Sequence, residues 1–278
     1  MSSDNAAEMS LHEAAEALDV HYMTIYRYVR LGLLDAHKSG KQWRVTPEAL
    51  ARFVERPAPD HAGGDAPWAQ RLESRMVAGD ANGAWSVVEA ALAAGHEPAA
   101  IYSEYLAPAL RSIGDKWETG ELGVHDEHLA SNVAARLIGR LGPRFSRRGR
   151  PKGTVITAMP PGDDHSLSSA MIADIARSAG YSVLDLGANT PIESLASTAA
   201  ETGDLSAVCI SIVYDAALDD AAAMIAAFKR ASPGVPVYVG GRAVPTAAGA
   251  EEIGADGWAG SLDEVAGLLT GAPPVPAD

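Results

Sequence analysis

The spacing of hydrophobic and polar positions changes along the chain and divides it into regions. Apolar positions recur every three or four residues between residues 11 and 31, as on one face of a helix. Alanine-rich runs at residues 81–94, 97–113 and 125–141 repeat this helical spacing. After residue 152, short β-rich runs alternate with helical segments, which predicts a parallel sheet. The expected strands are residues 154–159, 182–186, 207–213, 235–240 and 257–259, with helices after the first four and a last helix at 262–269.

Composition limits the class of protein. The chain has 278 residues, 47% of them hydrophobic, and a formal net charge of −14, which suits a folded protein of two or three domains. The longest apolar run, residues 221–228, is far below the roughly 18 residues of a membrane span, and the first ten residues do not resemble a signal peptide. We therefore expect a cytoplasmic protein with no membrane partner. The single cysteine, Cys209, lies in an apolar run and is expected to be a buried hydrophobe.

The first region has the spacing of a helix-turn-helix. Residues 11–18 and 22–31 have helical periodicity and are separated by a short turn. Ile25 and Val29 form an inward stripe, so the opposite face of the second helix would lie in a major groove. A hairpin with Gly40 at its tip follows, in the position of a phosphate-gripping wing, and Trp43 is expected to pack this wing onto the helices. The predicted DNA contacts are Thr24, Tyr26, Arg27, Arg30, Lys38, Lys41 and Arg44.

Local charge supports this interpretation. Residues 21–56 hold seven Lys and Arg against three Asp and Glu, although the whole chain is acidic. The alternative is a helical protein-interaction module with solvated arginines. The sequence HEAAEALDVHYMTIYRYVRLGLLDAHKSGKQWRV resembles the winged helix-turn-helix of the excisionase/MerR superfamily. That resemblance implies binding to double-stranded operator DNA.

Proline and glycine mark the boundaries between regions, because they interrupt all periodicity at residues 57–67 and again at 143–152. The second interruption contains five basic residues and no acid. We interpret it as a solvated linker, with phosphate contact or assembly as the alternative. The predicted organisation is a winged helix-turn-helix at 9–56, a linker at 57–67, a four-helix bundle at 68–142, a basic linker at 143–152, a flavodoxin/Rossmann-like parallel α/β sheet at 153–271 and a tail at 272–278.

Polar residues and glycines follow the first, third and fourth predicted strands. The segment 162–165 reads Gly-Asp-Asp-His, Ser211 lies near the end of the third strand, and Gly240 and Gly241 close the fourth. In the strand order 2-1-3-4-5 these strands are neighbours, and ligands bind at the carboxyl ends of such sheets. Asp163 is placed to accept a hydrogen bond from the His165 ring, as an acceptor behind a metal-ligating histidine does. A helix-capping or solvated His165 is the alternative.

Together with the segment 186–191, these motifs resemble the cobalamin-binding domain shared by methionine synthase and corrinoid proteins. The resemblance implies that His165 holds cobalt from below and that Ser211, Gly240 and Gly241 line the slot for the dimethylbenzimidazole tail. The sequence departs from the family at two positions. Ser168 replaces the glycine of Asp-x-His-x-x-Gly, and Val213 replaces the leucine of Ser-x-Leu.

In the helical region, nine residues separate Trp117 from the pair Glu127 and His128. The alternatives are a core tryptophan, a solvated acidic helix start, and a zinc site at His125 and His128. The spacing resembles the bundle of the B12-dependent light-responsive repressors of the CarH/CarA type, which implies that the three side chains cover the upper face of adenosylcobalamin. In repressors whose photoproduct is bis-histidine, a histidine follows this tryptophan, whereas this chain has Glu118.

The order of the regions over residues 9–270 matches the same repressors. The resemblance implies a non-enzymatic, light-responsive transcriptional regulator that binds adenosylcobalamin and operator DNA, self-associates as a dimer or tetramer, and changes its assembly when light removes the upper ligand. The alternatives are a photosensor that holds a bilin or another corrinoid on the same scaffold, and a corrinoid methyl carrier for partner methyltransferases.

Overall fold

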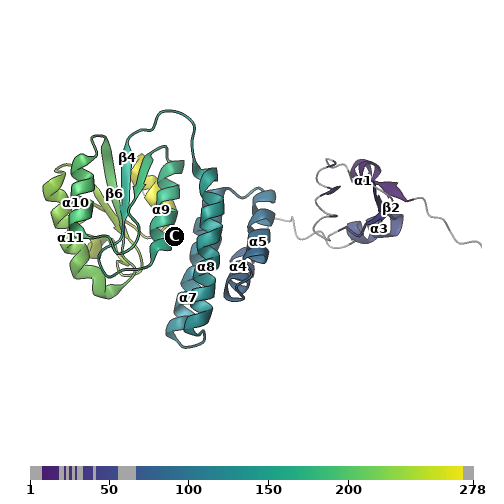
Figure 1. Cartoon of the computed structure of the whole chain (residues 1–278), viewed down its shortest axis with the longest axis horizontal. Helices are drawn as coiled ribbons and strands as arrows, with labels where there is room; N and C mark the ends of the chain where they lie inside the picture. The colour runs from purple at the N-terminus through teal and green to yellow at the C-terminus, as the bar shows by residue number, and fades with distance from the viewer. Residues whose placement is uncertain are drawn as a thin grey trace, which may run out of the picture. The chain divides into compact units, whose positions relative to one another are not determined.

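The computed structural model describes residues 8–18, 22, 25, 26, 29, 34–39, 42–55 and 67–271 (Figure 1). The chain divides into two compact units, residues 1–66 and 67–278. All but the last residue of the predicted linker at 57–67, and the predicted tail at 272–278, lie outside the described residues.

The first unit contains short strands and helices around a small core. Helix α1 begins at Ser10, whose hydroxyl accepts from the Glu13 amide while the Glu13 carboxylate accepts from the Ser10 amide, a reciprocal cap that fixes the helix start. In the described part of this unit the antiparallel sheet has the order β1-β3-β2. The elements are β1 (Met9–Ser10), α1 (Leu11–Ala17), β2 (His37–Ser39), β3 (Gln42–Val45) and α3 (Pro47–Glu55).

The second predicted helix of this unit is described only at Tyr22, Ile25, Tyr26 and Val29, all of which are helical. Ile25 is fully buried and Val29 nearly so, which confirms the predicted inward stripe. Trp43 is half-buried against the same core, so the prediction that it packs the wing onto the helices is confirmed. Thr24, Arg27, Arg30, Gly40 and Lys41 lie outside the described residues.

The second unit begins with the helical bundle. Segments α6, η1 and α7 follow one another directly, and η1 has π-helical hydrogen bonding. Pro108 lies just after η1 and has no N–H for the carbonyl four residues earlier, which accounts for the changed hydrogen-bond pattern. The predicted helices are confirmed. Their bounds are α4 (Trp68–Val77), α5 (Ala81–Ala93), α6 (Pro98–Ala100), η1 (Ile101–Leu106), α7 (Ala107–Glu118), α8 (Val124–Leu141) and the 3-10 turn η2 (Gly142–Phe145).

Within residues 67–271, five strands form one parallel sheet in the order β5-β4-β6-β7-β8, as the sequence predicts. The third strand begins and ends two residues before its predicted bounds, so Ser211 is its last residue. The strands are β4 (Thr154–Ala158), β5 (Ser182–Asp185), β6 (Leu205–Ser211), β7 (Val237–Gly240) and β8 (Gly257–Ala259). The helices are α9 (Ser166–Ser178), α10 (Ile192–Glu201), the turn η3 (Asp215–Ala217), α11 (Leu218–Ala231), α12 (Ala247–Glu252) and α13 (Leu262–Thr270).

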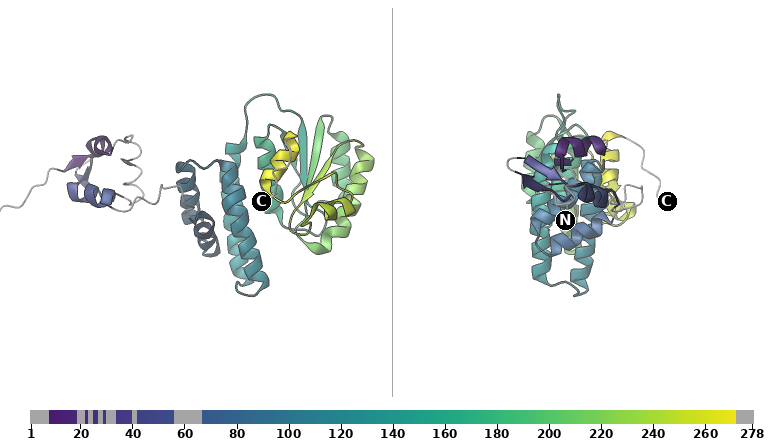
Figure 2. Two further views of the ribbon diagram at one scale, coloured as in Figure 1. Left: turned by 180° about the vertical axis from the view of Figure 1, so that it is seen from behind. Right: turned by 90° about the vertical axis from the view of Figure 1, so that its right-hand side faces the viewer.

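Helices cover both faces of the sheet. Helices α10 and α11 cover one face, whereas α9 and α13 cover the face toward the bundle (Figures 1 and 2). One hydrophobic core runs from the bundle into α9, α13 and the sheet without interruption. Cys209 is buried in this core, and burial raises the pKa of its thiol to about 12, in keeping with the prediction of a hydrophobe.

A buried polar contact joins the bundle to α9. The Tyr102 hydroxyl on η1 donates to Asp174 Oδ2 at 2.8 Å, and Arg177 pairs with the other carboxylate oxygen at 2.7 Å. The Tyr102 ring also stacks on Phe145 with centroids 4.8 Å apart. Tyr102 is fully buried and Asp174 nearly so, and both would lose this 2.8 Å hydrogen bond if the bundle separated from α9 here, although Asp174 would keep its ion pair with Arg177.

None of the described helices combines the length and the apolar character that a membrane crossing requires.

Candidate functional site

His165 lies on the loop between β4 and α9, at the carboxyl end of the sheet. Its Nδ1 is 2.7 Å from Asp163 Oδ1, and its backbone amide donates to the same oxygen at 3.2 Å. The hydrogen bond to Asp163 raises the pKa of the His165 ring, and burial opposes it. The imidazole is 58% exposed while Asp163 is fully buried. This bond directs Nε2 away from the carboxylate, and no described residue forms a hydrogen bond with Nε2.

Asp163 also fixes the loop to the neighbouring strand. Its second carboxylate oxygen accepts from the backbone amides of Val213 at 2.7 Å and Tyr214 at 3.1 Å, directly after β6. Burial favours the neutral carboxyl, but the hydrogen bond from the His165 ring and those from the backbone amides of Val213, Tyr214 and His165 together outweigh burial and hold the pKa of Asp163 below its usual range. A charged acceptor therefore orients the imidazole and ties two adjacent strand ends together. Val213 makes this contact with its backbone amide, so the replacement of the family's leucine by valine leaves the hydrogen bond to Asp163 intact.

Ser168 and Ser211 are hydrogen-bonded to each other. The buried Ser211 hydroxyl donates to Ser168 Oγ at 2.9 Å, and Ser168 donates to the His165 carbonyl at 3.1 Å. A glycine at position 168 could make neither bond. The departure from the family motif thus places a side chain between the histidine loop and the end of β6.

Gly240 and Gly241 are required by the backbone itself. A Cβ on Gly240 would lie 2.3 Å from the Ala259 carbonyl oxygen, and one on Gly241 would lie 2.3 Å from that of Ile212. Gly241 also has a φ of +105°. The resemblance implies that these glycines line the slot for a ligand, and close packing between neighbouring strands gives an independent reason for glycine at both positions.

A cavity of about 170 Å³ connects these groups. Ser168, Ser211, Gly240 and Gly241 all line it, together with residues of the bundle and of the segment 259–262. The three strand ends that the sequence placed together are neighbours in the sheet. The structure therefore brings Ser211, Gly240 and Gly241 together around one cavity. Asp163 and His165 are not part of its lining, but their loop is joined to it by the hydrogen bond from Ser168 to the His165 carbonyl.

The predicted cap residues lie on the bundle. Trp117 is near the end of α7 and is 47% exposed, which excludes the alternative of a core tryptophan. Glu127 and His128 lie in the first turns of α8, with His128 Nε2 3.7 Å from Glu127 Oε2. Glu127 acts electrostatically on His165 and raises the pKa of its ring. Among the described residues, no group of three or more His, Cys, Asp or Glu side chains is arranged to hold a metal ion, which gives the zinc alternative no support.

Arg242, next to the glycine pair, was not predicted from the sequence and contacts the bundle. It follows Gly241 and hydrogen-bonds the Glu118 carboxylate, and its guanidinium also lies 3.9 Å from Asp115. The Arg242 hydrogen bond holds the pKa of Glu118 below its ordinary value. The pair joins the loop after β7 to the end of α7. An arginine beside a glycine pair carries no spacing signal that would have identified it.

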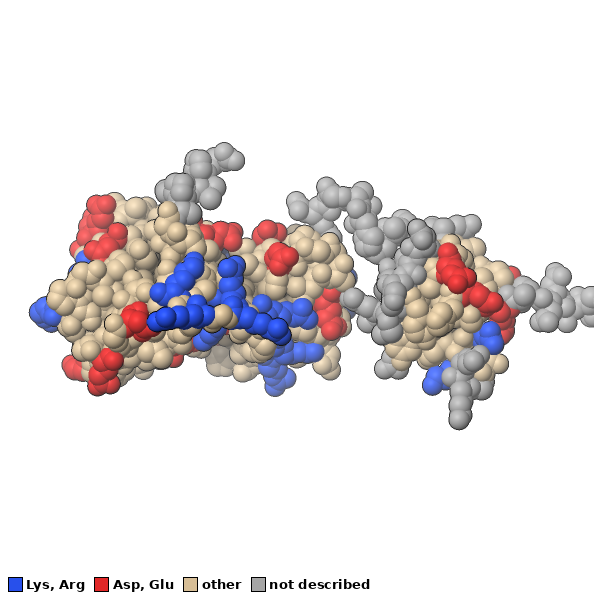
Figure 3. Space-filling model, turned by 90° about the horizontal axis from the view of Figure 1, so that it is seen from above, with Lys and Arg blue, Asp and Glu red and all other residues tan. Residues whose placement is uncertain are grey.

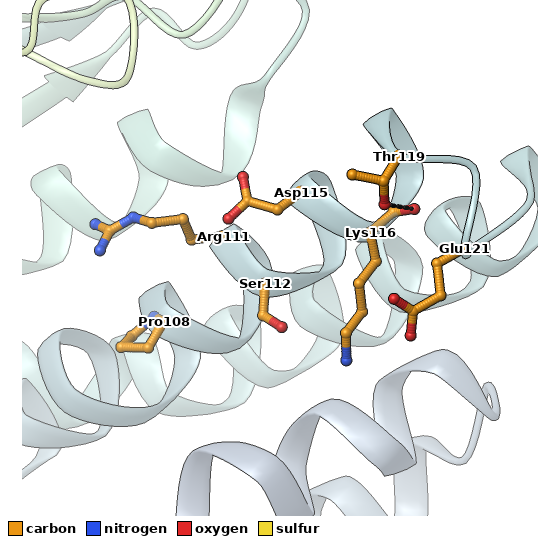
Figure 4. Close-up of a pocket in the computed structure, with 7 residues that line it drawn as sticks. All are labelled: Pro108, Arg111, Ser112, Asp115, Lys116, Thr119 and Glu121. Atoms are coloured by element: carbon orange, nitrogen blue, oxygen red, sulfur yellow. Dashed lines mark hydrogen bonds between the residues drawn. The ribbon is translucent and has the colours of Figure 1, made fainter.

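A second hollow of about 460 Å³ lies along the outer surface of α7 (Figure 4). Three of its polar side chains already have partners: Lys116 bonds Glu73 at 2.6 Å, Thr119 donates to the Lys116 carbonyl, and Asp115 lies beside Arg242. The predicted residues are not part of its lining, so we place the candidate site at the smaller cavity.

Three of the predicted DNA-contacting residues lie among the described residues of the first unit. Tyr26 is half-buried against the core and its ring centroid lies 6.4 Å from that of Tyr22. Lys38 is exposed on β2, with its ammonium 5.3 Å from the Trp43 ring centroid. Arg44 on β3 is half-buried and acts electrostatically on Glu13. Their contact with DNA stays a prediction.

Family models match three parts of the chain. A helix-turn-helix domain matches residues 8–57, and two models described as B12 binding domains match residues 68–141 and 153–266. The three matched ranges cover the first unit, the bundle and the sheet in that order.

Among curated proteins, the chain is 31% identical over 199 residues to the HTH-type transcriptional repressor CarH of Myxococcus xanthus, covering 70% of this chain and 64% of that protein. It thus spans somewhat less than two thirds of that relative. It is 27% identical to the dimethylamine corrinoid protein of Methanosarcina barkeri, covering 60% of this chain and 80% of that one. The solved structure of the monomethylamine corrinoid protein of the same organism superposes on this one with a TM-score of 0.67 and 21% sequence identity. The superposition covers 75% of this chain and 99% of the other, which shows a shared fold.

Proposed function

Because this chain belongs to the proteins that join a helix-turn-helix domain to B12-binding domains, we propose that it is a light-responsive transcriptional regulator. It binds operator DNA through the first unit and adenosylcobalamin between the bundle and the sheet. Its relative CarH is a repressor by name. No catalytic turnover is part of this proposal.

The observation that carries the proposal is the geometry of His165. The imidazole is held by a fully buried carboxylate at Nδ1, and Nε2 is left for a ligand outside the loop. This is the donor arrangement that a metal-ligating histidine requires, because the carboxylate fixes the ring orientation and increases the basicity of the other nitrogen. The residues present therefore fit a corrinoid whose cobalt is held from below.

Other residues of the site have separate tasks. Ser211, Gly240 and Gly241 line the cavity that would receive the nucleotide tail. Trp117 offers an exposed aromatic face on the bundle, and Glu127 and His128 offer polar groups on the next helix. Together they would cover the upper ligand and exclude water from it.

Bound adenosylcobalamin would supply a cobalt–carbon bond that light breaks. The chain converts that event into a signal only if its assembly or shape differs between the two ligand states, because a ligand shifts an equilibrium by its differential affinity alone. Loss of the upper group would leave Trp117 without its contact and so alter the bundle surface. Two winged helices that bind one operator together gain affinity through effective concentration, which links self-association to DNA binding.

The test uses the full chain mixed with adenosylcobalamin in the dark. We expect a base-off absorption spectrum that changes on green illumination, together with a change in operator retardation in a gel-shift assay. His165→Ala should abolish the base-off histidine-ligated spectrum. His125→Ala removes an exposed histidine that bonds only Asp126 among the described residues, and it serves as the matched control. Equal spectra for the wild type and His165→Ala would refute the assignment.

Two alternatives have distinct outcomes in the same experiment. A corrinoid methyl carrier is favoured by the shared fold with a corrinoid protein, and it would accept a methyl group on cobalt from a partner methyltransferase and retard no promoter fragment. A photosensor that also holds a bilin or another corrinoid would show absorption bands that adenosylcobalamin lacks. The helix-turn-helix domain favours the regulator, because methyl transfer between partner enzymes does not require a DNA-binding domain.

A further inference from the structure

Exposed basic side chains gather where the bundle joins the sheet. The segment 136–152 contains seven Arg and Lys and no acidic residue, in a chain that has 36 acidic residues against 22 basic ones. All seven side chains are exposed. A blue band crosses the corresponding face of the second unit (Figure 3). We call this set the basic band: Arg136, Arg140, Arg144, Arg147, Arg148, Arg150 and Lys152.

The charge of the basic band is not neutralised within the described chain. The ion pairs formed by other arginines join them to nearby acids, as Arg177 joins Asp174 and Arg242 joins Glu118. Among the described residues, no ion pair includes a member of the basic band. Seven like charges within seventeen residues repel one another, so an external polyanion would relieve that repulsion.

The band is anchored to the fold at several points. The Arg140 guanidinium lies 3.8 Å from the centroid of the Trp85 ring, and the buried Phe145 ring stacks on Tyr102. At the far end, the Lys152 amide donates to the Gly180 carbonyl and its ammonium lies 5.6 Å from the Tyr181 ring. A surface held in place by core contacts loses less conformational freedom on binding than a free tail does.

We propose that the basic band binds the phosphate backbone of DNA, as a second, sequence-independent contact beside the helix-turn-helix domain. This inference rests on the DNA-binding half of the proposed function. The band is rich in arginine, whose planar guanidinium matches phosphate oxygens in a bidentate way. DNA held by the first unit would be tethered close to the second unit, which raises the effective concentration of phosphate at the band.

A phosphate partner explains the composition of this surface better than a second copy of the chain does. The segment 136–152 contains no acidic residue, and its exposed apolar side chains are Pro143 and Pro151, whereas interfaces between copies have an apolar core and charges of both signs. The acidic remainder of the chain would repel DNA, so a basic surface on the second unit gives it one face on which DNA is attracted.

The test compares two double variants of the full chain that carry the same charge change. Arg147→Gln with Arg148→Gln removes two exposed guanidiniums of the band. Arg71→Gln with Arg230→Gln removes two exposed guanidiniums from α4 and α11. Binding to a mixed-sequence DNA duplex is measured by fluorescence anisotropy over a series of salt concentrations, and cobalamin uptake and sedimentation are measured for each protein.

We expect the band variant to bind the duplex about tenfold more weakly than the control variant at low salt, with the slope of log K against log salt reduced by roughly 1.8, since each lost phosphate contact contributes about 0.9. Equal slopes in the two variants, with DNA binding retained by the wild type, would overturn this inference and leave the proposed function intact. A change of sedimentation without a change of slope would identify an interface between copies and also overturn it. Failure of the wild type to bind any DNA would reject the DNA-binding half of the proposed function as well.

Discussion

Replacing Ser168 by glycine tests how this chain departs from the cobalamin-binding motif that it resembles. The Ser168 hydroxyl accepts a hydrogen bond from the Ser211 hydroxyl and donates one to the His165 carbonyl, and both serines line the candidate cavity. A nucleotide tail that enters the cavity either breaks the Ser211–Ser168 hydrogen bond or binds in a cavity that the Ser168 side chain makes narrower than a glycine would. Ser168→Gly removes that obstacle and restores the residue of the family motif.

The magnitude follows from the hydrogen bond that is lost. A neutral intramolecular hydrogen bond contributes about 0.5–1.5 kcal/mol, so a ligand that no longer has to break it should bind up to about tenfold more tightly. The free protein should become less stable, because Ser211 is buried and would lack its partner, at about 1–3 kcal/mol. Glycine in the first turns of α9 adds about 0.5–1 kcal/mol.

The assay is a titration with adenosylcobalamin in the dark, followed by visible absorption, and a urea unfolding curve without ligand. Ser178→Gly is the matched control, because Ser178 lies on the same helix and donates to the Ile175 carbonyl within it. We expect both variants to lose stability and only Ser168→Gly to gain affinity. An unchanged or weaker affinity in Ser168→Gly would show that the Ser168–Ser211 pair does not restrict the cavity.

Three further predictions concern stability. Tyr102→Phe should lower the free energy of unfolding by about 1.5–3 kcal/mol in urea, because the buried Asp174 carboxylate keeps Arg177 but loses the Tyr102 hydroxyl as a donor; a loss under 0.5 kcal/mol would contradict this. Gly241→Ala should lower the stability of the protein more than Gly234→Ala does. Both glycines have positive φ, but only a Cβ at position 241 would collide with a carbonyl oxygen, so the Gly241→Ala variant should have the lower thermal midpoint. Asp256 accepts from Lys229 and from the Val237 amide, and these bonds outweigh burial and hold its pKa below the usual value. Its charged form therefore stabilises the fold above the unfolded pKa of about 3.9, and Asp256→Asn should be less stable than the wild type by about 1 kcal/mol or less at pH 6, with a difference that shrinks as the pH falls to 3.

The strand order could be predicted because each strand is a short apolar run bounded by glycine or polar residues, and because helices between the strands force parallel pairing. The same order predicted that the His165 loop, Ser211 and Gly240 would meet. Helical spacing likewise predicted the bundle. Strand ends were less well predicted: Ser211 ends β6, since backbone pairing with β7 stops there while the apolar run in the sequence continues to Val213.

Contacts between distant segments could not be predicted from spacing. Arg242 and Glu118 are separated by 124 positions, and Tyr102 and Asp174 by 72, so no local pattern links either pair. The Ser168 contact is of the same kind, because a hydroxyl in the first turns of a helix usually signals capping or solvent exposure. Side-chain partners across elements depend on packing angles that the periodicity of one element does not contain.

The two ends of the bundle are attached to the sheet by contacts of different strength. At the end that carries Tyr102, a buried hydroxyl, a buried carboxylate and a stacked aromatic pair hold η1 and η2 to α9. At the end that carries Trp117, the described ion pairs to the sheet are exposed, with Glu118 and Arg242 about half accessible. Exposed pairs contribute about 0–1 kcal/mol, whereas loss of a buried charged partner costs several-fold more. A ligand change beneath Trp117 would therefore displace that end of the bundle and leave the Tyr102 end in place, which makes the Trp117 end the part of this fold where a signal from the cobalamin site would first alter the protein surface.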